Sequence, residues 1–342
     1  MEQVCDKQIW INKTINLLEK NQDKIHWDML SSNPNAIHLL EKNQDKIFWE
    51  ILSQNPNAME LLENNQDKII WRRLSENPNA IHLLEKHLLE NIPNKISWYK
   101  LSKNPNAMHI LEKNQDNIWW DMLSFNPNAN ELLEKNLKKR WWFWFSINPR
   151  VISILEERQD KISWVGLSQN PNAISILEKN QDKIKWEYLS KNPNAMHLLE
   201  KNLDKIHWKN LSGNPNAISI LEKNQDKIDW DYLSDNPNAI SILEKNLDKI
   251  SWYKLSKNPN AISILEKNFK NICWEALSTN PNAIHLLEKN LKYICWDELS
   301  RNKGVYEINY KFMKERMDII REDLMKAVYQ DRKSTRLNSS HG

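Results

Sequence analysis

Hydrophobic positions recur along most of the chain with a period of 22 residues. Tryptophan marks the period: Trp27, Trp49 and Trp71 lie 22 residues apart, and ten further tryptophans from Trp98 to Trp296 keep that interval. Each unit reads W-x-x-L-S-x-N-P-N-A-I-x-[LI]-L-E-K-N-[QL]-D-K-I-x, and the Asn-Pro pair occurs twelve times. Self-similarity at a short fixed period is the signature of repeat architectures, so the pattern predicts a tandem repeat protein.

One unit predicts two short helices. Residues 217–221 place apolar side chains at helical spacing, and residues 228–233 form a second apolar run. We expect Asn214, which precedes a proline, to be the N-cap of the first helix and Asn224 to end it in a left-handed conformation. Asp226 is then expected to cap the second helix. The second asparagine of each Asn-Pro-Asn triplet is a candidate for bonding the backbone of the adjacent unit.

Helices of about two turns are too short to be stable alone, so the units must stack on one another. The predicted fold class is therefore all-α: an α-solenoid of about twelve 22-residue two-helix repeats with terminal caps, of open handedness. At about 8–10 Å per unit the array would be elongated, about 100 Å long, with its Trp, Leu, Ala and Ile positions buried. A leucine-rich-repeat horseshoe is the main alternative, but no stretch alternates with a period of two.

The pattern also predicts the domain organisation. Residues 1–26 are an N-terminal capping part-repeat, 27–295 the array, and 296–330 a part-repeat followed by a capping amphipathic helix. Five extra residues near 87–91 should lengthen a helix or loop and disturb the stacking locally. Residues 331–341 resemble a translated sequencing adapter, so we expect residues 331–342 to be a non-native tail.

The unit is similar to tandem repeats in uncharacterised proteins of giant DNA viruses over roughly residues 10–302. That resemblance implies a viral or metagenomic origin and supplies no catalytic residue, ligand or partner. The shorter L-S-x-N-P portion also resembles the leucine-rich-variant repeat, which alternates α and 3-10 helices.

Composition narrows the protein class. Four glycines in 342 residues argue against an open α/β enzyme, whose phosphate loops and tight turns require glycine. The net charge of +3 indicates no general polyanion binder. No apolar run is long enough to span a membrane, and no signal peptide opens the chain. Three cysteines are typical of a reduced compartment, and we expect an intracellular, cytoplasmic protein.

No motif predicts catalysis, a cofactor or a metal site, and we expect the protein not to be an enzyme. Histidines recur at equivalent positions of different units, where a spacing of about 8–10 Å is too wide for two ring nitrogens to share a zinc ion. The same spacing separates Cys273 from Cys295, which we expect to be reduced thiols. Carboxylates and amines repeat identically along the chain, as expected for a solvated face.

One segment departs from the repeat and is the candidate partner-binding site. Aromatic and basic residues gather there at variable positions, as a binding hot spot requires. The candidate residues are Trp119, Phe125, Lys138, Lys139, Arg140, Trp141, Phe143, Trp144 and Arg150. The alternative interpretation is local repacking, with larger side chains compensating for Phe145 and Val151.

These observations favour a non-enzymatic repeat scaffold for protein–protein interaction, with an unidentified protein partner and an open oligomeric state. The alternative function is a nucleic-acid-binding α-solenoid. The second and third positions after each tryptophan are mixed in charge and often acidic, for example Asp28 and Glu50, which disfavours tracking of phosphates.

Overall fold

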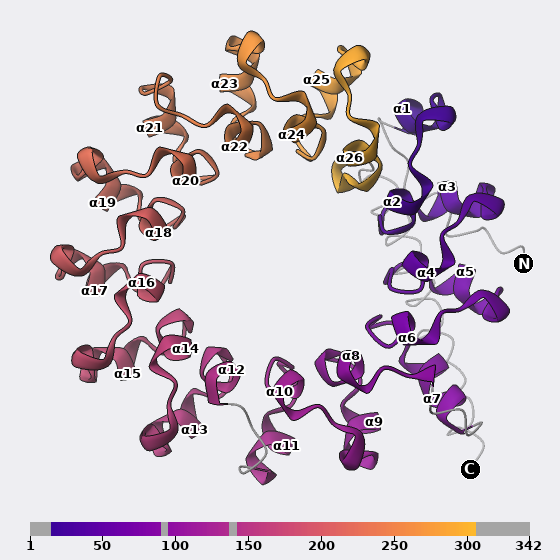
Figure 1. The fold of residues 1–342 in the computed structure, drawn as a ribbon, viewed down its shortest axis with the longest axis horizontal. Coiled ribbons are helices and arrows are strands. Elements are labelled where there is room, and N and C mark those ends of the chain that lie inside the picture. Colours follow the sequence, from indigo (N-terminus) through magenta and orange to yellow (C-terminus); the bar gives the residue numbers. More distant parts are fainter. Residues whose placement is uncertain (1–14, 90–94, 137–141, 306–342) are drawn as a thin grey trace, which may run out of the picture.

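The computed structural model describes residues 15–89, 95–136 and 142–305, and this part of the chain is entirely helical, without strands. The prediction of an all-α solenoid is confirmed. Each unit consists of an inner α-helix that begins at the repeat tryptophan, an outer α-helix, and in most units a single 3-10 turn leading to the next inner helix (Figure 1).

The thirteen inner helices of the described residues are α2 (Trp27–Ser31), α4 (Trp49–Leu52), α6 (Trp71–Leu74), α8 (Trp98–Lys103), α10 (Trp120–Leu123), α12 (Trp142–Ile147), α14 (Trp164–Gln169), α16 (Trp186–Leu189), α18 (Trp208–Ser212), α20 (Trp230–Ser234), α22 (Trp252–Lys257), α24 (Trp274–Ser278) and α26 (Trp296–Arg301). The outer helices are α1 (Ile15–Glu19), α3 (Ile37–Lys42), α5 (Met59–Glu63), α7 (Ile81–Leu89), α9 (Met108–Lys113), α11 (Asn130–Lys135), α13 (Ile152–Glu157), α15 (Ile174–Lys179), α17 (Met196–Glu200), α19 (Ile218–Lys223), α21 (Ile240–Glu244), α23 (Ile262–Lys267) and α25 (Ile284–Glu288).

All but the last of the 3-10 turns carry the Gln-Asp-Lys segment of the repeat or its equivalent. They are η2 (Gln22–Lys24), η3 (Gln44–Lys46), η4 (Gln66–Lys68), η6 (Gln115–Asn117), η8 (Gln159–Lys161), η9 (Gln181–Lys183), η10 (Leu203–Lys205), η11 (Gln225–Lys227), η12 (Phe269–Asn271), η13 (Leu291–Tyr293) and η14 (Lys303–Val305), the last of which occupies the Asn-Pro-Asn-Ala position.

A buried asparagine ladder joins consecutive units. The Asn236 side-chain amide donates to the carbonyls of Ser212 (3.0 Å) and Asn214 (2.9 Å) in the preceding unit. The exposed Asn238 amide donates to the Pro215 carbonyl at 2.9 Å. Asn236 is 1% exposed, so its amide satisfies carbonyls that water does not reach. The prediction that the second asparagine bonds the adjacent unit is confirmed, and the first asparagine bonds it as well.

The expected helix caps are wrong in detail. The outer helix begins at Ile218, after the Asn-Pro-Asn turn, and Asn214 accepts the backbone N–H of Asn216 at 3.0 Å instead of capping a helix. Asn224 has φ −135°, outside the left-handed region, and its amide donates to the Ile220 carbonyl. Asp226 lies inside a 3-10 turn. Short polar side chains close local turns as readily as they cap helices, so sequence spacing alone does not distinguish the two roles.

The repeat leucines and alanines are fully buried, but the tryptophans are only partly buried. In several units the lysine of the Asp-Lys-Ile segment covers the tryptophan; Lys227 lies 4.8 Å from the centroid of the Trp208 ring. The indole thus covers the edge of the core on one side and contacts a lysine ammonium on the other. A cation over the face of a tryptophan ring is a favourable interaction. The expectation of a buried tryptophan position is corrected accordingly.

The insertion lengthens helix α7 to nine residues, as predicted. His87 from this extra turn is buried and stacks on Trp71 with ring centroids 3.8 Å apart, in the place that lysine takes elsewhere. The expected disturbance of stacking does not occur, because Asn104 still donates to the carbonyls of Ser75 and Asn77. The extra turn of α7 extends the outer wall and leaves the ladder intact.

The array closes on itself into a ring (Figure 1). Helix α26 packs against α2, and the Asn33 amide donates to the carbonyls of Ser300 (3.2 Å) and Asn302 (3.1 Å). The Asn35 amide donates to the Lys303 carbonyl at 3.0 Å. These are the bonds that join any two consecutive units, so the expectation of an elongated array is wrong. A small rotation per unit accumulates along a solenoid, and thirteen units complete one turn.

The two part-repeats combine into one unit instead of capping two separate ends. Residues 296–305 supply its inner helix and turn, and residues 15–26 supply its outer helix and 3-10 turn. The His26 N–H donates to the Ser300 hydroxyl at 3.2 Å, and Lys24 lies 5.0 Å from the centroid of the Trp296 ring. We call residues 15–26 and 296–305 together the closing unit. The predicted C-terminal capping helix and the tail 331–342 lie outside the described residues.

The asparagine ladder predicts that Asn236→Ala lowers the free energy of unfolding by about 1–3 kcal/mol, because two buried carbonyls lose their donor. Asn238→Ala removes one solvent-exposed bond and should cost clearly less. Urea unfolding followed by circular dichroism measures both changes. Equal losses for the two variants would contradict a dominant role for the buried asparagine.

Close backbone approach at the closing unit predicts that Gly304→Ala weakens ring closure. A Cβ at Gly304 would lie 2.2 Å from the Pro281 carbonyl oxygen, so backbone must move. We expect a loss of about 1–3 kcal/mol in unfolding free energy, typical of overpacking, with an increased radius of gyration in small-angle scattering if the ring opens.

Gly213→Ala is the matched control, because its nearest contact would be an ordinary 3.6 Å. A Gly304→Ala protein as stable as the Gly213→Ala protein would show that this approach does not limit closure.

Candidate functional site

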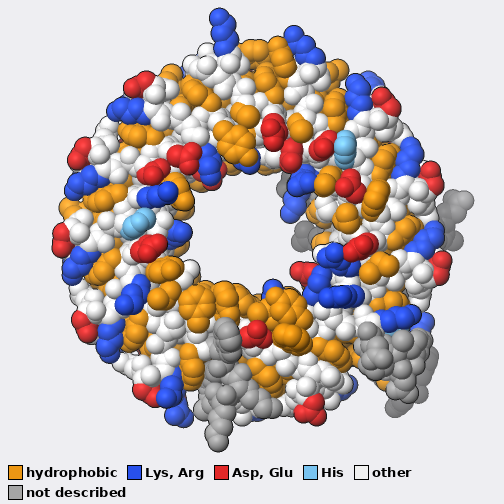
Figure 2. All heavy atoms as spheres, in the orientation of Figure 1, with side chains coloured by type: hydrophobic (Ala, Val, Ile, Leu, Met, Phe, Trp, Pro, Cys, Tyr) orange, Lys and Arg blue, Asp and Glu red, His pale blue; other side chains and the backbone are white. Residues whose placement is uncertain are grey.

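Five aromatic side chains gather on the inner rim of the ring. Tyr99, Trp119, Phe125, Phe143 and Trp144 come from helices α8 and α12 and from the residues that flank α10; we call them the aromatic arc. Figure 2 shows hydrophobic side chains gathered along the lower edge of the central opening, where Figure 1 places α8 to α14. The arc therefore borders the opening and lies away from the outer wall.

The repeat backbone determines which arc side chains reach solvent. Trp119 precedes α10, and its N–H donates to the Ser102 hydroxyl at 3.0 Å, a bond that other units make at the same position. That bond holds the backbone in place, while the indole projects into solvent and is 52% exposed. Tyr99 and Phe125 are 41% and 40% exposed. Large aromatic side chains this exposed on adjacent units create an apolar patch, which soluble proteins usually retain for binding.

Ring contacts form two groups within the arc, which spans three units. Tyr99 meets Trp119 edge-on with centroids 5.4 Å apart, and Phe125 lies 4.1 Å from Trp144, which in turn contacts Phe143. Lys103 bridges the two groups, because its ammonium lies 5.0 Å from the Tyr99 centroid and 5.8 Å from that of Phe125. The arrangement is two groups of contacting aromatic rings with one cation between them.

Local repacking explains part of the departure from the repeat. Phe145 and Val151 replace leucine and alanine and are fully buried, and Asn148 keeps the bond to the Ser124 carbonyl. Gly166 on α14 accommodates α12, since a Cβ there would lie 2.5 Å from the Phe143 carbonyl oxygen. Repacking does not account for Trp119, whose ring is half exposed. Repacking therefore explains Phe145 and Val151 but not the exposure of Trp119.

The structure divides the predicted site residues into three groups. Trp119, Phe125, Phe143 and Trp144 come together in the arc. Arg150 takes a ladder position instead, donating to the Pro127 carbonyl (3.2 Å) and to Asn128 Oδ1 (2.8 Å). Lys138, Lys139, Arg140 and Trp141 lie outside the described residues.

Sequence reasoning missed Tyr99 and Lys103 as members of the site. They occupy the second and sixth positions of the unit, four residues apart on one face of α8. The signal that would have found them is the alignment of rim positions across neighbouring units: a tyrosine, a tryptophan and a phenylalanine follow one another at such positions. The candidate segment was instead defined by contiguity along the chain.

Charge is distributed unevenly beside the arc. Helices α6 and α8 contain Arg72, Arg73, Lys100 and Lys103 and no acidic residue, whereas Asp121 is the single charged residue in α10, α12 and α14. Arg73 pairs with Glu50 and Lys100 with Glu76, each at 2.7 Å. The arc is thus apolar along most of its length and bordered by cations at the α6–α8 end.

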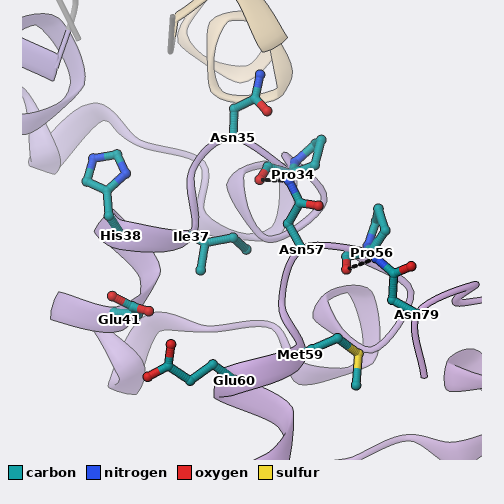
Figure 3. A pocket seen from close by; sticks show the side chains of 10 residues that line it. All are labelled: Pro34, Asn35, Ile37, His38, Glu41, Pro56, Asn57, Met59, Glu60 and Asn79. Carbon is teal, nitrogen blue, oxygen red and sulfur yellow. Dashed lines mark hydrogen bonds between the residues drawn. The ribbon is translucent and has the colours of Figure 1, made fainter. Parts of the chain in front are cut away.

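A second candidate is an open hollow between α3 and α5, with a volume of about 430 Å³. In Figure 3 the side chains of Ile37 and Met59 lie in its middle, with the carboxylates of Glu41 and Glu60 beside them. Ile37 and Met59 occupy a position that holds a partly buried hydrophobic residue in most of the other described units. The hollow is therefore lined by positions that recur along the outer wall.

Among the described residues no group of three or more His, Cys, Asp or Glu side chains is placed to hold a metal ion. Cys273 and Cys295 are free thiols. No helix in the described ranges is long and apolar enough to cross a membrane.

Burial at the edge of the hollow lowers the pKa of His38 below its usual 6.5, against the attraction of Glu19. A depressed folded-state pKa means that the unfolded chain takes up the proton first, so stability falls as pH drops below about 6.5. We expect His38→Ser to reduce this acid sensitivity, measured as thermal midpoints from pH 8 to pH 5. His285→Ser, at the same repeat position but half exposed, is the control. Indistinguishable pH profiles of the wild type and His38→Ser would contradict the assignment.

Comparison of the chain with protein-family models, with curated proteins and with solved structures gave no match.

Proposed function

We propose that the protein is a non-enzymatic ring scaffold that binds a protein partner through the aromatic arc. The observation that carries the proposal is the exposure of Tyr99, Trp119 and Phe125, on consecutive units of an inner rim whose equivalent positions elsewhere are mostly polar or charged. Partly exposed tryptophan and tyrosine beside basic residues are the composition of binding hot spots.

Rigid presentation supports the same proposal. Each arc residue belongs to a unit held on both sides by the asparagine ladder, as Asn126 shows by donating to the Ser102 and Asn104 carbonyls. A surface fixed in advance loses little conformational entropy when a partner binds. In this proposal the ring provides a preorganised binding surface and no catalytic site.

Nucleic-acid binding is the weaker alternative. Lys103 above two aromatic rings would suit stacked bases of a single strand. Phosphate tracking requires a continuous basic path, and the inner rim includes the acidic cluster Asp229, Asp231 and Asp235 at α20. Binding of a protein partner does not require a uniformly basic rim.

The proposal predicts that Trp119→Ala reduces capture of the partner about tenfold or more, because a central aromatic anchor carries much of the binding energy. Tagged protein would be recovered from cells, with and without nuclease, and bound proteins quantified by mass spectrometry. Stability should change by no more than about 0.5 kcal/mol, as for a typical surface substitution.

Phe48→Ala is the matched control, because Phe48 occupies the same repeat position, is also 52% exposed and lies away from the arc. Capture that is equal for both variants would refute the arc as the binding site. Loss of the captured proteins after nuclease treatment would favour the nucleic-acid alternative.

A further inference from the structure

We propose that the occupant of the aromatic arc is a short linear peptide segment that carries both apolar side chains and a carboxylate. Its apolar side chains would lie against Trp119, Phe125 and Trp144, and its carboxylate would lie at Lys103. This inference rests on the proposed function and deepens it, because it specifies the chemistry and shape of the partner at the same site.

The size of the opening favours a linear segment over a folded domain. Thirteen inner helices spaced about 8–10 Å apart form a circle about 35–40 Å across at the helix axes. Helices with side chains are about 10–12 Å wide, which leaves an opening of about 25–30 Å. A folded domain of 100 residues, with a radius of gyration of about 13 Å, does not fit inside, whereas an extended chain or a single helix does.

The length of the arc sets the length of the segment. The arc residues belong to three consecutive units, which cover about 20–30 Å along the rim at the spacing of packed helices. An extended chain rises about 3.3 Å per residue, so about six to nine residues of partner span it. Alternate side chains of such a segment would face the rim, which matches a series of separate aromatic contacts.

Charge complementarity assigns the carboxylate. In the described part of the chain, Arg72 and Lys103 form no ion pair, while their neighbours Arg73 and Lys100 are already paired with Glu50 and Glu76. The ammonium of Lys103 is exposed and lies over two aromatic rings. An anionic group at Lys103 would therefore meet a cation without displacing an existing partner, and Arg72 adds positive charge on the neighbouring inner helix α6.

The repeat supplies a matched control for Lys103. Helices α8 and α22 share the hexapeptide W-Y-K-L-S-K, and Lys257 lies 4.4 Å from the Tyr253 centroid, as Lys103 lies over Tyr99. The next unit differs, since Cys273 and Thr279 stand where Trp119 and Phe125 stand beside α8. Lys103→Glu and Lys257→Glu thus make the same change in the same local sequence, with and without the arc.

The experiment selects random twelve-residue peptides from a display library on the full-length ring. Enriched peptides are synthesised with a fluorophore, and their binding is followed by anisotropy. We expect enriched peptides to be net negative and to contain at least two apolar residues. Lys103→Glu should weaken their binding about tenfold or more, whereas Lys257→Glu should change it less than twofold.

Three outcomes would overturn the inference: enriched peptides that are neutral or basic, an equal effect of the two lysine variants, or no enrichment over a Trp119→Ala protein. A uridine oligonucleotide that binds and displaces the peptides would assign the arc to single-stranded nucleic acid instead. Suppose that Trp119→Ala abolishes capture of the cellular partner, but Lys103→Glu does not weaken binding of the selected peptides. The scaffold proposal then stands and the proposal of an acidic segment is refuted. If Trp119→Ala changes neither, both are refuted.

Discussion

The buried asparagine at the seventh position of each unit is the interaction on which the structure depends. In all described units but one, its amide donates to two carbonyls of the preceding unit, as Asn258 does to Ser234 and Asn236; the exception, Asn148, donates to the Ser124 carbonyl. An open array would leave such carbonyls without a donor at one end and an unused amide at the other, which is costly where water is excluded. Closure of the ring satisfies both edges at once. The same bond that stacks two units therefore also favours joining the first unit to the last.

Closure explains why the chain begins and ends its repeats inside a unit. The closing unit takes its outer helix from residues 15–26 and its inner helix from residues 296–305, so its two halves meet through non-covalent contacts such as His26 to Ser300. Lys303 and Gly304 replace the Pro-Asn of other units, yet Asn302 still accepts the N–H of Gly304 at 2.8 Å. A backbone turn can thus be retained by one side chain while the residues around it change.

A regular scaffold makes local irregularity informative. Leucine, serine, alanine and asparagine at the buried positions repeat because every unit must present the same surface to its neighbours. The rim positions are free of that requirement, so their residues reflect other demands. The aromatic arc and the cations of α6 and α8 occupy neighbouring rim positions. This part of the rim therefore differs in composition from the rest of a regular ring.

The sequence by itself determined the unit, its helical nature, the stacking role of the second asparagine and four of the arc residues, because each follows from a periodicity or from a departure from it; the buried first asparagine was predicted as a helix cap. It did not determine closure, since curvature arises from small rotations between units that no single residue encodes. For the same reason the sequence predicts two separate caps, in residues 1–26 and 296–330, although residues 15–26 and 296–305 together contain one whole unit. Only the tertiary structure showed that Tyr99 and Lys103 belong to the candidate site, because rim positions about 22 residues apart in the sequence are neighbours in the ring.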